Sequence, residues 1–151
     1  MSGQTALQYH AQLSQCREVF INKTRDYGTS WRVMRVSSLI DQIFIKAQRI
    51  RSIEEKGRQR VADSVAGEYG AIVNYCIIAL IQLELGESLS DNIADTKLFA
   101  LYDEKALEAQ KLMEAKNHDY GEAWREMLMT SLTDMILAKL MRIRQIMSNE
   151  G

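Results

Sequence analysis

Apolar residues recur three and four positions apart along most of the chain, which is the spacing of one face of an α-helix. Proline, which interrupts helices, is absent from the sequence. The pattern therefore predicts an all-α fold, a helical bundle of about five helices. The expected helices cover residues 5–23, 38–57, 63–85, 96–116 and 131–147. The third is apolar over most of its surface, so we expect it to be the central helix.

The second half of the chain repeats the first at a distance of 93 positions. Between residues 23–51 and 116–144, 15 of 29 positions are identical without a gap. The shared pattern is K-x2-D-Y-G-x2-W-R-x-M-x3-S-L-x-D-x-I-x2-K-x2-R-I-R. We predict a single helical domain, 1–151, built from a tandem helix–loop–helix repeat. The first unit spans about 5–86, a polar connector spans 87–95, and the second unit spans about 96–151 and lacks its final helix.

This shorter second unit leaves an apolar helix face that needs cover. The single third helix could serve both units, another chain could supply the surface, or the chain could be cut short of a sixth helix. We favour a homodimer as the expected partner arrangement, because exposed apolar helix faces seldom remain uncovered.

Composition narrows the class of protein without revealing a function. Apolar residues make up 46% and charged residues 26% of the chain, as in ordinary globular proteins. The sequence has no long uninterrupted apolar run and no signal-peptide order at its N-terminus, so we expect a soluble, cytoplasmic protein without a membrane partner. A sequence pI near 6.1 argues against general nucleic-acid binding. Cys16 and Cys76 form no CxxC pair and are expected to act as small hydrophobic residues.

The repeated loop carries side chains that suit a nucleotide. Tyr27 and Trp31 could stack on a base, and the guanidinium of Arg32 could donate to a phosphate. Another interpretation stays open. Gly28 could simply end the helix, the aromatic residues could plug the corner between two helices, and Arg32 could pair with Asp26.

The helix after this loop carries a second polar group. Asp41, Lys46 and Arg49 share one face, and both copies retain the two cations, which favours an anion site. Asp41 could instead cap the helix, because Ser38-x-x-Asp41 has the spacing of a capping box. Asp41 and Glu68 are the candidate Mg²⁺ ligands, although Glu68 could equally pair with Lys46 or Arg49.

The residues shared by the two copies predict binding of a nucleotide-like ligand. No catalytic residue can be assigned, because the sequence contains no phosphate-binding loop motif and no nucleophile with a positioned base. The candidate ligand-binding residues are Lys23, Asp26, Tyr27, Trp31, Arg32, Lys46, Arg49, Lys116, Asp119, Tyr120, Trp124, Arg125, Lys139 and Arg142.

At KTRDYGTSWR, SLIDQIFIKAQRIR and EYGAIVNY, and again at KNHDYGEAWR and SLTDMILAKLMRIR, the chain resembles the bacterial and phage family called nucleotide modification associated domain one. The resemblance implies a role in nucleotide or modified-base metabolism. The positions that it carries over are Lys23, Asp26, Tyr27, Trp31, Asp41, Lys46, Arg49, Glu68 and Asn74. The helical layout is also similar to MazG-type nucleotide pyrophosphohydrolases, whose helices hold Mg²⁺ through acids; the third helix here has fewer acids than that pattern implies.

Two functions from different classes follow from these observations. The first is a protein that binds a nucleotide-like small molecule through Lys46, Arg49 and Arg32, with Tyr27 or Trp31 against the base and Mg²⁺-dependent hydrolysis left open. The second is a non-enzymatic helical assembly module, in which the cations only bridge to the acidic segment 61–115.

Overall fold

The computed structural model describes residues 3–57, 64–89 and 93–150. Its elements are α1 (Gly3–Tyr27), η1 (Ser30–Val33), α2 (Val36–Lys56), α3 (Val65–Leu85), α4 (Asp95–Tyr120), η2 (Ala123–Glu126) and α5 (Met129–Glu150). Each η element is a short 3₁₀ helix. The predicted all-α bundle with five α-helices is confirmed for the described part of the chain.

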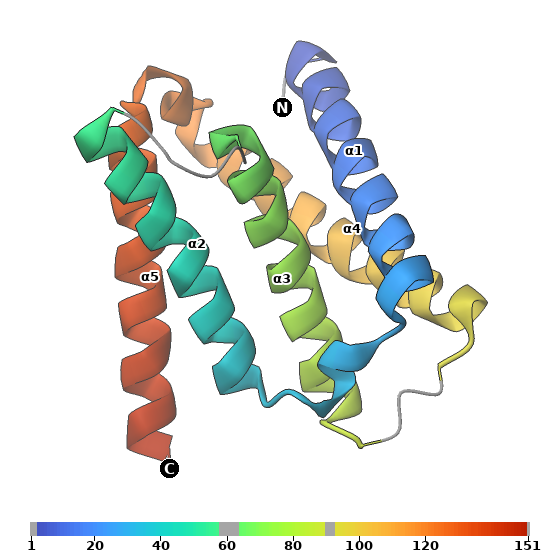
Figure 1. The fold of residues 1–151 in the computed structure, drawn as a ribbon. Coiled ribbons are helices and arrows are strands. Elements are labelled where there is room, and N and C mark those ends of the chain that lie inside the picture. Colours follow the sequence, from blue (N-terminus) through green and yellow to red (C-terminus); the bar gives the residue numbers. More distant parts are fainter. Residues whose placement is uncertain (1–2, 58–63, 90–92, 151) are drawn as a thin grey trace.

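Helix α3 occupies the centre of the bundle. It packs against α1, α2 and α4, while α5 packs along α2 (Figure 1). The sequence predicted this position, because α3 is the most apolar helix of the chain. By length and composition alone α3 could also span a membrane, and 39% of its apolar stretch is buried among the other helices.

The buried apolar side chains form two clusters, and α3 contributes residues to both. The cluster shared by α1, α3 and α4 also takes in Leu39 and contains Phe20, Leu39, Ile77, Ile78, Ala79, Ile81, Leu98, Leu101, Tyr102 and Ala106. The cluster of α2 and α5 takes in Ile72 of α3 and contains Ile40, Ile43, Ala47, Ile50, Ile72, Leu137 and Leu140. Because α3 contributes to both clusters, it joins the two halves of the molecule.

Two glycines end the helices that precede the η elements. Gly28 and Gly121 adopt positive φ angles of 64° and 61°, and each donates its N–H to the carbonyl four residues earlier. The prediction that these helices stop near Lys23 and Lys116 is wrong by about one turn. A C-terminal glycine lies just outside the helix it ends, so the Asp-Tyr residues before it still belong to the last helical turn.

The capping interpretation of Asp41 is also wrong. Helix α2 begins at Val36, ahead of the predicted Ser38, and its N-cap Arg35 makes no side-chain cap. Asp41 instead accepts a hydrogen bond from Arg144 of α5. At the start of α3, the Oγ of Ser64 accepts a hydrogen bond from the Gly67 N–H at 2.9 Å. Residue 63, where the sequence predicted the start of this helix, lies outside the described residues.

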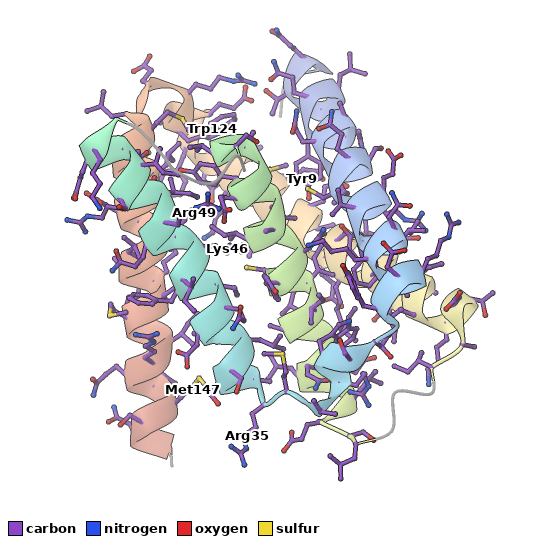
Figure 2. All side chains as sticks on the ribbon, in the orientation of Figure 1. Tyr9, Arg35, Lys46, Arg49, Trp124 and Met147 are labelled. Atoms are coloured by element: carbon purple, nitrogen blue, oxygen red, sulfur yellow. The ribbon has the colours of Figure 1, made fainter. Side chains whose placement is uncertain are left out.

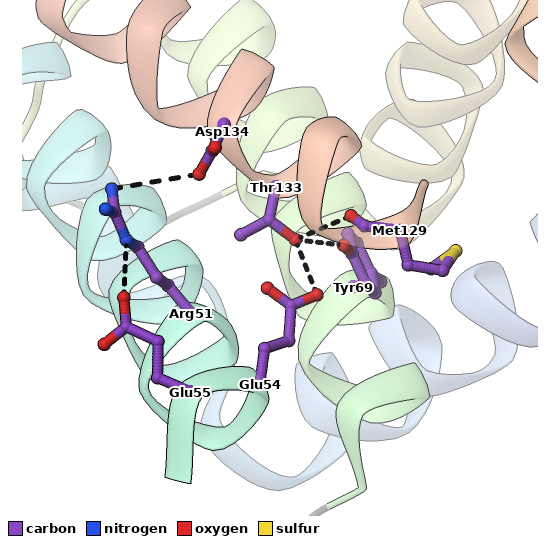
Figure 3. A network of polar contacts seen from close by, with 7 residues as sticks. All are labelled: Arg51, Glu54, Glu55, Tyr69, Met129, Thr133 and Asp134. Atoms are coloured by element: carbon purple, nitrogen blue, oxygen red, sulfur yellow. Dashed lines mark hydrogen bonds and ion pairs between the residues drawn. The ribbon is translucent and has the colours of Figure 1, made fainter. Parts of the chain in front are cut away.

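Polar side chains fasten the first turns of α5 to α2 and α3 (Figure 3). The Thr133 hydroxyl lies 2.8 Å from the Tyr69 hydroxyl and donates to Glu54 at 3.1 Å. Nearby, the Arg51 guanidinium lies 3.8 Å from Asp134. Thr133 is fully buried, so these contacts satisfy a polar group inside the interface.

Candidate functional site

A cavity of about 1270 Å³ lies between α1 and α3. Its wall on the α1 side extends from Gln12 to Tyr27 and continues into η1, and its wall on the α3 side extends from Ser64 to Ile78. It exceeds the roughly 300–1000 Å³ of common small-molecule sites, so it has room for a ligand of nucleotide size.

Three of the predicted ligand-binding residues line this cavity: Lys23, Tyr27 and Trp31. Lys23 and Tyr27 come from the last turns of α1, and Trp31 comes from η1. Tyr27 is 73% exposed, whereas Trp31 is partly buried against the α1–α3–α4 cluster. The open Tyr27 therefore contradicts the interpretation that this tyrosine plugs the helix corner.

Lys23 is the one charged side chain among the described residues that line the cavity. The rest of the lining is apolar or uncharged, and its aromatic members are Phe20, Tyr27, Trp31, Tyr69 and Tyr75. A lone cation beside aromatic rings favours a ligand with a flat apolar part and a small number of negative charges.

Asn74 holds the deep wall of the cavity in place. Its side-chain amide donates to the carbonyl of Cys16 at 2.9 Å and accepts from the Tyr102 hydroxyl at 2.8 Å. These two bonds connect α3 to α1 and to α4. Burial raises the pKa of Tyr102 far above its usual range, which keeps the hydroxyl protonated as the donor to Asn74. Asn74 therefore shapes the wall with both ends of its amide already bonded.

Arg32 does not reach the cavity. It is 7% exposed, and its Nη1 donates to the Gln82 side chain and, at 2.5 Å, to the carbonyl of Gly86. The Gln82 amide in turn donates to the carbonyls of Arg32 and Met34 at 2.8 and 2.7 Å. Arg32 is not among the residues that line the cavity, and it does not pair with Asp26. Its bonds hold the loop after α1 against the end of α3.

Lys46 and Arg49 point from α2 toward α3, where both pair with Glu68 (Figure 2). Arg49 Nη1 lies 2.5 Å from Glu68 Oε1, and Lys46 Nζ lies 3.3 Å from Oε2. The second contact has the distance of an ion pair but lacks the geometry of a hydrogen bond. Glu68 is 2% exposed, so one buried carboxylate is compensated by two cations. The sequence had left this pairing open as an alternative to a metal site.

The two candidate Mg²⁺ ligands are not brought together. Asp41 is exposed on the side of α2 that faces α5, and Glu68 is buried between α2 and α3. Each carboxylate already has a cationic partner from the chain. In the described ranges, no group of three His, Cys, Asp or Glu side chains gathers where a metal could bind.

The remaining predicted residues lie on the surface without forming a second site. Asp26, Lys116, Asp119 and Tyr120 are exposed at the ends of α1 and α4. Arg125 donates to Thr5 and Gln8 of α1 and lies over the ring of Trp124, with its Cζ 4.5 Å from the ring centroid. Lys139 and Arg142 are exposed on α5. Equivalent residues of the two units therefore have different surroundings.

Several residues of the cavity were missed by the sequence reasoning. Gln12 and Gln15 of α1 line the cavity, as do the small residues Gly67 and Gly70 of α3. The available signal was the run Ala66-Gly67-x-x-Gly70, whose small side chains leave room beside a neighbouring helix. Nothing in that run alone indicates which helix lies opposite.

Comparison with known proteins gives a family and no close relative. No curated protein and no solved structure matches the chain. The similarity to MazG-type pyrophosphohydrolases thus stays a prediction. The family model described as nucleotide modification associated domain 1 matches residues 23–83 and 116–151, which begin 93 positions apart like the two copies of the repeated pattern. These two segments cover more than half of the sequence, and the chain therefore belongs to the nucleotide modification associated domain 1 family.

Proposed function

We propose that this chain binds a nucleotide in the cavity between α1 and α3. The observation that carries the proposal is the meeting of Lys23, Tyr27 and Trp31 at one large concave site. All three come from the duplicated pattern, and the family is named for an association with nucleotide modification.

We assign the phosphate contact to Lys23. The sequence had predicted Lys46, Arg49 and Arg32 for this role. Lys46 and Arg49 are paired with Glu68, and Arg32 is held by Gln82 and Gly86. Lys23 is exposed and faces the cavity, so its ammonium group is available to an anionic ligand. A lysine ammonium binds phosphate oxygens as a compact point charge.

The aromatic residues supply the second half of the recognition. The exposed Tyr27 ring offers a face on which a purine or pyrimidine can stack, and Trp31 closes the same corner from η1. Base-to-aromatic stacking contributes about 1–3 kcal/mol and tolerates different bases. The site is therefore proposed to select for a phosphate beside a flat ring, with the base chosen by contacts deeper in the cavity.

The single positive charge of the cavity lining favours a ligand with few phosphate groups. One cation and no carboxylate appear among the described lining residues, so the site offers little compensation for a triphosphate and no acidic ligand for Mg²⁺. We expect a nucleoside monophosphate to bind more tightly than the corresponding triphosphate. We also expect that Mg²⁺ does not strengthen binding of the monophosphate.

Isothermal titration calorimetry with nucleoside mono-, di- and triphosphates, with and without Mg²⁺, tests the proposal. Lys23→Ala should weaken binding about ten-fold, the loss expected for one charge-assisted contact of about 1.5 kcal/mol. Lys116→Ala is the matched control, because Lys116 is the repeat counterpart of Lys23, is exposed, and is absent from the cavity lining. Absence of heat with every nucleotide, or equal loss in the two variants, would overturn the proposal.

A further inference from the structure

The two units bury the same residues to different extents. Ile50 of α2 is fully buried, whereas its counterpart Ile143 of α5 is 38% exposed. Arg32 is buried and its counterpart Arg125 is exposed. In the first unit, Ile50 belongs to the cluster that α2 forms with Ile72 of α3, and Arg32 bonds to Gln82 of α3. The second unit has the same residue types at these positions and, in the described ranges, no helix in the place of α3.

The cations of α5 also differ in their surroundings from their counterparts on α2. Lys46 and Arg49 of α2 share the buried Glu68, but their counterparts Lys139 and Arg142 are exposed. Neither has an acidic partner anywhere in the described part of the chain. Two cations spaced three residues apart on a helix therefore lie open on a face that also exposes Ile143 and Ile146.

This face is poorly suited to a second copy of the chain packing α5 against α5. Such a symmetric contact would bring the Lys139 and Arg142 pairs of the two copies toward each other, and like charges at an interface oppose association. The α3 helix of a second copy is not available either, because its Glu68 is already enclosed by Lys46 and Arg49.

We propose that this face of α5, made by Lys139, Arg142, Ile143 and Ile146, is a docking surface for an α-helix of α3 type presented by a different protein chain. The partner helix is apolar on the side that meets Ile143 and carries one carboxylate at the level of Lys139 and Arg142. Helix α3 bound to α2 provides the example of this chemistry within the same molecule, since Glu68 there is paired with the equivalent two cations.

A synthetic peptide with the sequence of residues 64–86, labelled with a fluorophore and carrying a polyethylene-glycol tail for solubility, serves as the probe. Its binding to the full chain is followed by fluorescence anisotropy. The intact peptide should bind saturably, and the Glu68→Gln peptide should bind at least ten-fold more weakly. The Lys139→Ala/Arg142→Ala protein should lose affinity for the intact peptide by a similar factor, because either change leaves one side of the ion pair without its partner.

The control protein is Lys97→Ala/Lys111→Ala, which removes two exposed cations from α4 and should bind the peptide like the unaltered chain. Circular dichroism melting verifies that both double variants remain folded. Three results would overturn the proposal: no saturable binding, equal binding by the two double variants, or binding that is lost in Lys46→Ala instead, which would mean that the peptide replaces α3 on α2. Sedimentation of the chain alone could give a fourth such result. A dimer that dissociates in Lys139→Ala/Arg142→Ala would show that a second copy of the chain occupies this face.

Discussion

Asp41 of α2 and Arg144 of α5 form an ion pair in which Arg144 Nη2 lies 2.8 Å from Asp41 Oδ1. The counterpart of Asp41 in the second unit is Asp134, and it faces Arg51, the counterpart of Arg144 in the first unit, at 3.8 Å. The same two residue types are thus exchanged reciprocally between the paired helices. This reciprocity requires α2 and α5 to run antiparallel about a local two-fold axis, which places the two units face to face.

Exchanging the charges of the shorter pair should test this arrangement. Asp41→Arg and Arg144→Asp should each lower the free energy of unfolding by about 1 kcal/mol, and the double variant should recover most of the loss, as expected for exposed pairs. Arg144→Asp also removes the guanidinium that lies 4.1 Å from the Phe44 ring centroid, so recovery should be incomplete. Urea unfolding measures all four corners of the cycle. Strictly additive losses would contradict the pairing.

Arg32 and Arg125 offer a comparison between equal residues in unequal surroundings. Arg32→Ala should lower the free energy of unfolding by about 2–4 kcal/mol, because it leaves the buried Gln82 side chain and the Gly86 carbonyl without their donor. Arg125→Ala should cost less than about 1 kcal/mol, since Arg125 is exposed and the buried Thr5 hydroxyl, which it contacts, keeps its bond to Glu122. For a chain of this size, 1 kcal/mol corresponds to roughly 2–4 °C in Tm, so differential scanning calorimetry separates the two variants. Equal losses would contradict the locking role of Arg32.

The helices and the central place of α3 could be predicted from the sequence because both depend on local pattern. Apolar spacing marked five helices, and the even apolar surface of α3 indicated burial on several sides. Helix ends were predicted less well. The Gly after Asp-Tyr correctly indicated that a helix ends nearby. The glycine itself takes the left-handed conformation just beyond the last helical turn, so Asp26 and Tyr27 still belong to α1.

The candidate site was predicted only in part, because a repeated motif does not tell which of its side chains meets a partner from elsewhere in the chain. Lys23, Tyr27 and Trp31 do reach one cavity. Lys46 and Arg49 were predicted because both copies keep them, but in the first unit their partner is Glu68, which lies outside the repeated stretch 23–51. The pairing of Lys46 and Arg49 with Glu68 depends on how α2 packs against α3. The spacing of residues along α2 alone does not predict it.

Glu68→Gln should show how strongly the two cations depend on the buried carboxylate. The variant keeps the side-chain volume but removes the charge, so Lys46 and Arg49 are left facing an uncharged amide. We expect a loss of about 2–3 kcal/mol in the free energy of unfolding, below the roughly 3–5 kcal/mol of fully buried pairs because both cations retain contact with water. Glu104→Gln, which changes an exposed acid of α4, should cost less than about 0.5 kcal/mol. A Glu68→Gln protein as stable as the unaltered chain would contradict the pairing.

Tyr102 should make the fold sensitive to alkaline pH. Burial raises the pKa of its hydroxyl, so the folded chain keeps the proton at pH values where the unfolded chain releases it. The sign follows from proton uptake: the stability is fully present below about pH 10, the pKa of an unperturbed tyrosine, and falls as the pH rises above it. Tyr102→Phe should cost about 1–2 kcal/mol at neutral pH through the lost bond to Asn74, and it should reduce the decline above pH 10. Guanidinium unfolding at pH 8 and at pH 10.5 measures both effects. An unchanged decline in Tyr102→Phe would assign it to other groups.

The two cysteines allow the cavity to be observed directly. Cys16 lines the cavity, whereas Cys76 is exposed on α3 outside it. Burial raises the pKa of the Cys16 thiol, so its alkylation should be slow at pH 7 and accelerate as the pH rises. At pH 8.5, a saturating nucleoside monophosphate should slow iodoacetamide modification of Cys16 several-fold and leave the rate at Cys76 unchanged, because only the first thiol is covered by a ligand in the cavity. Mass spectrometry of peptides after timed quenching reads the two sites separately, and in Lys23→Ala the same protection should require a nucleotide concentration about ten-fold higher. Protection of both thiols, or of Cys76 alone, would place the ligand elsewhere in the molecule.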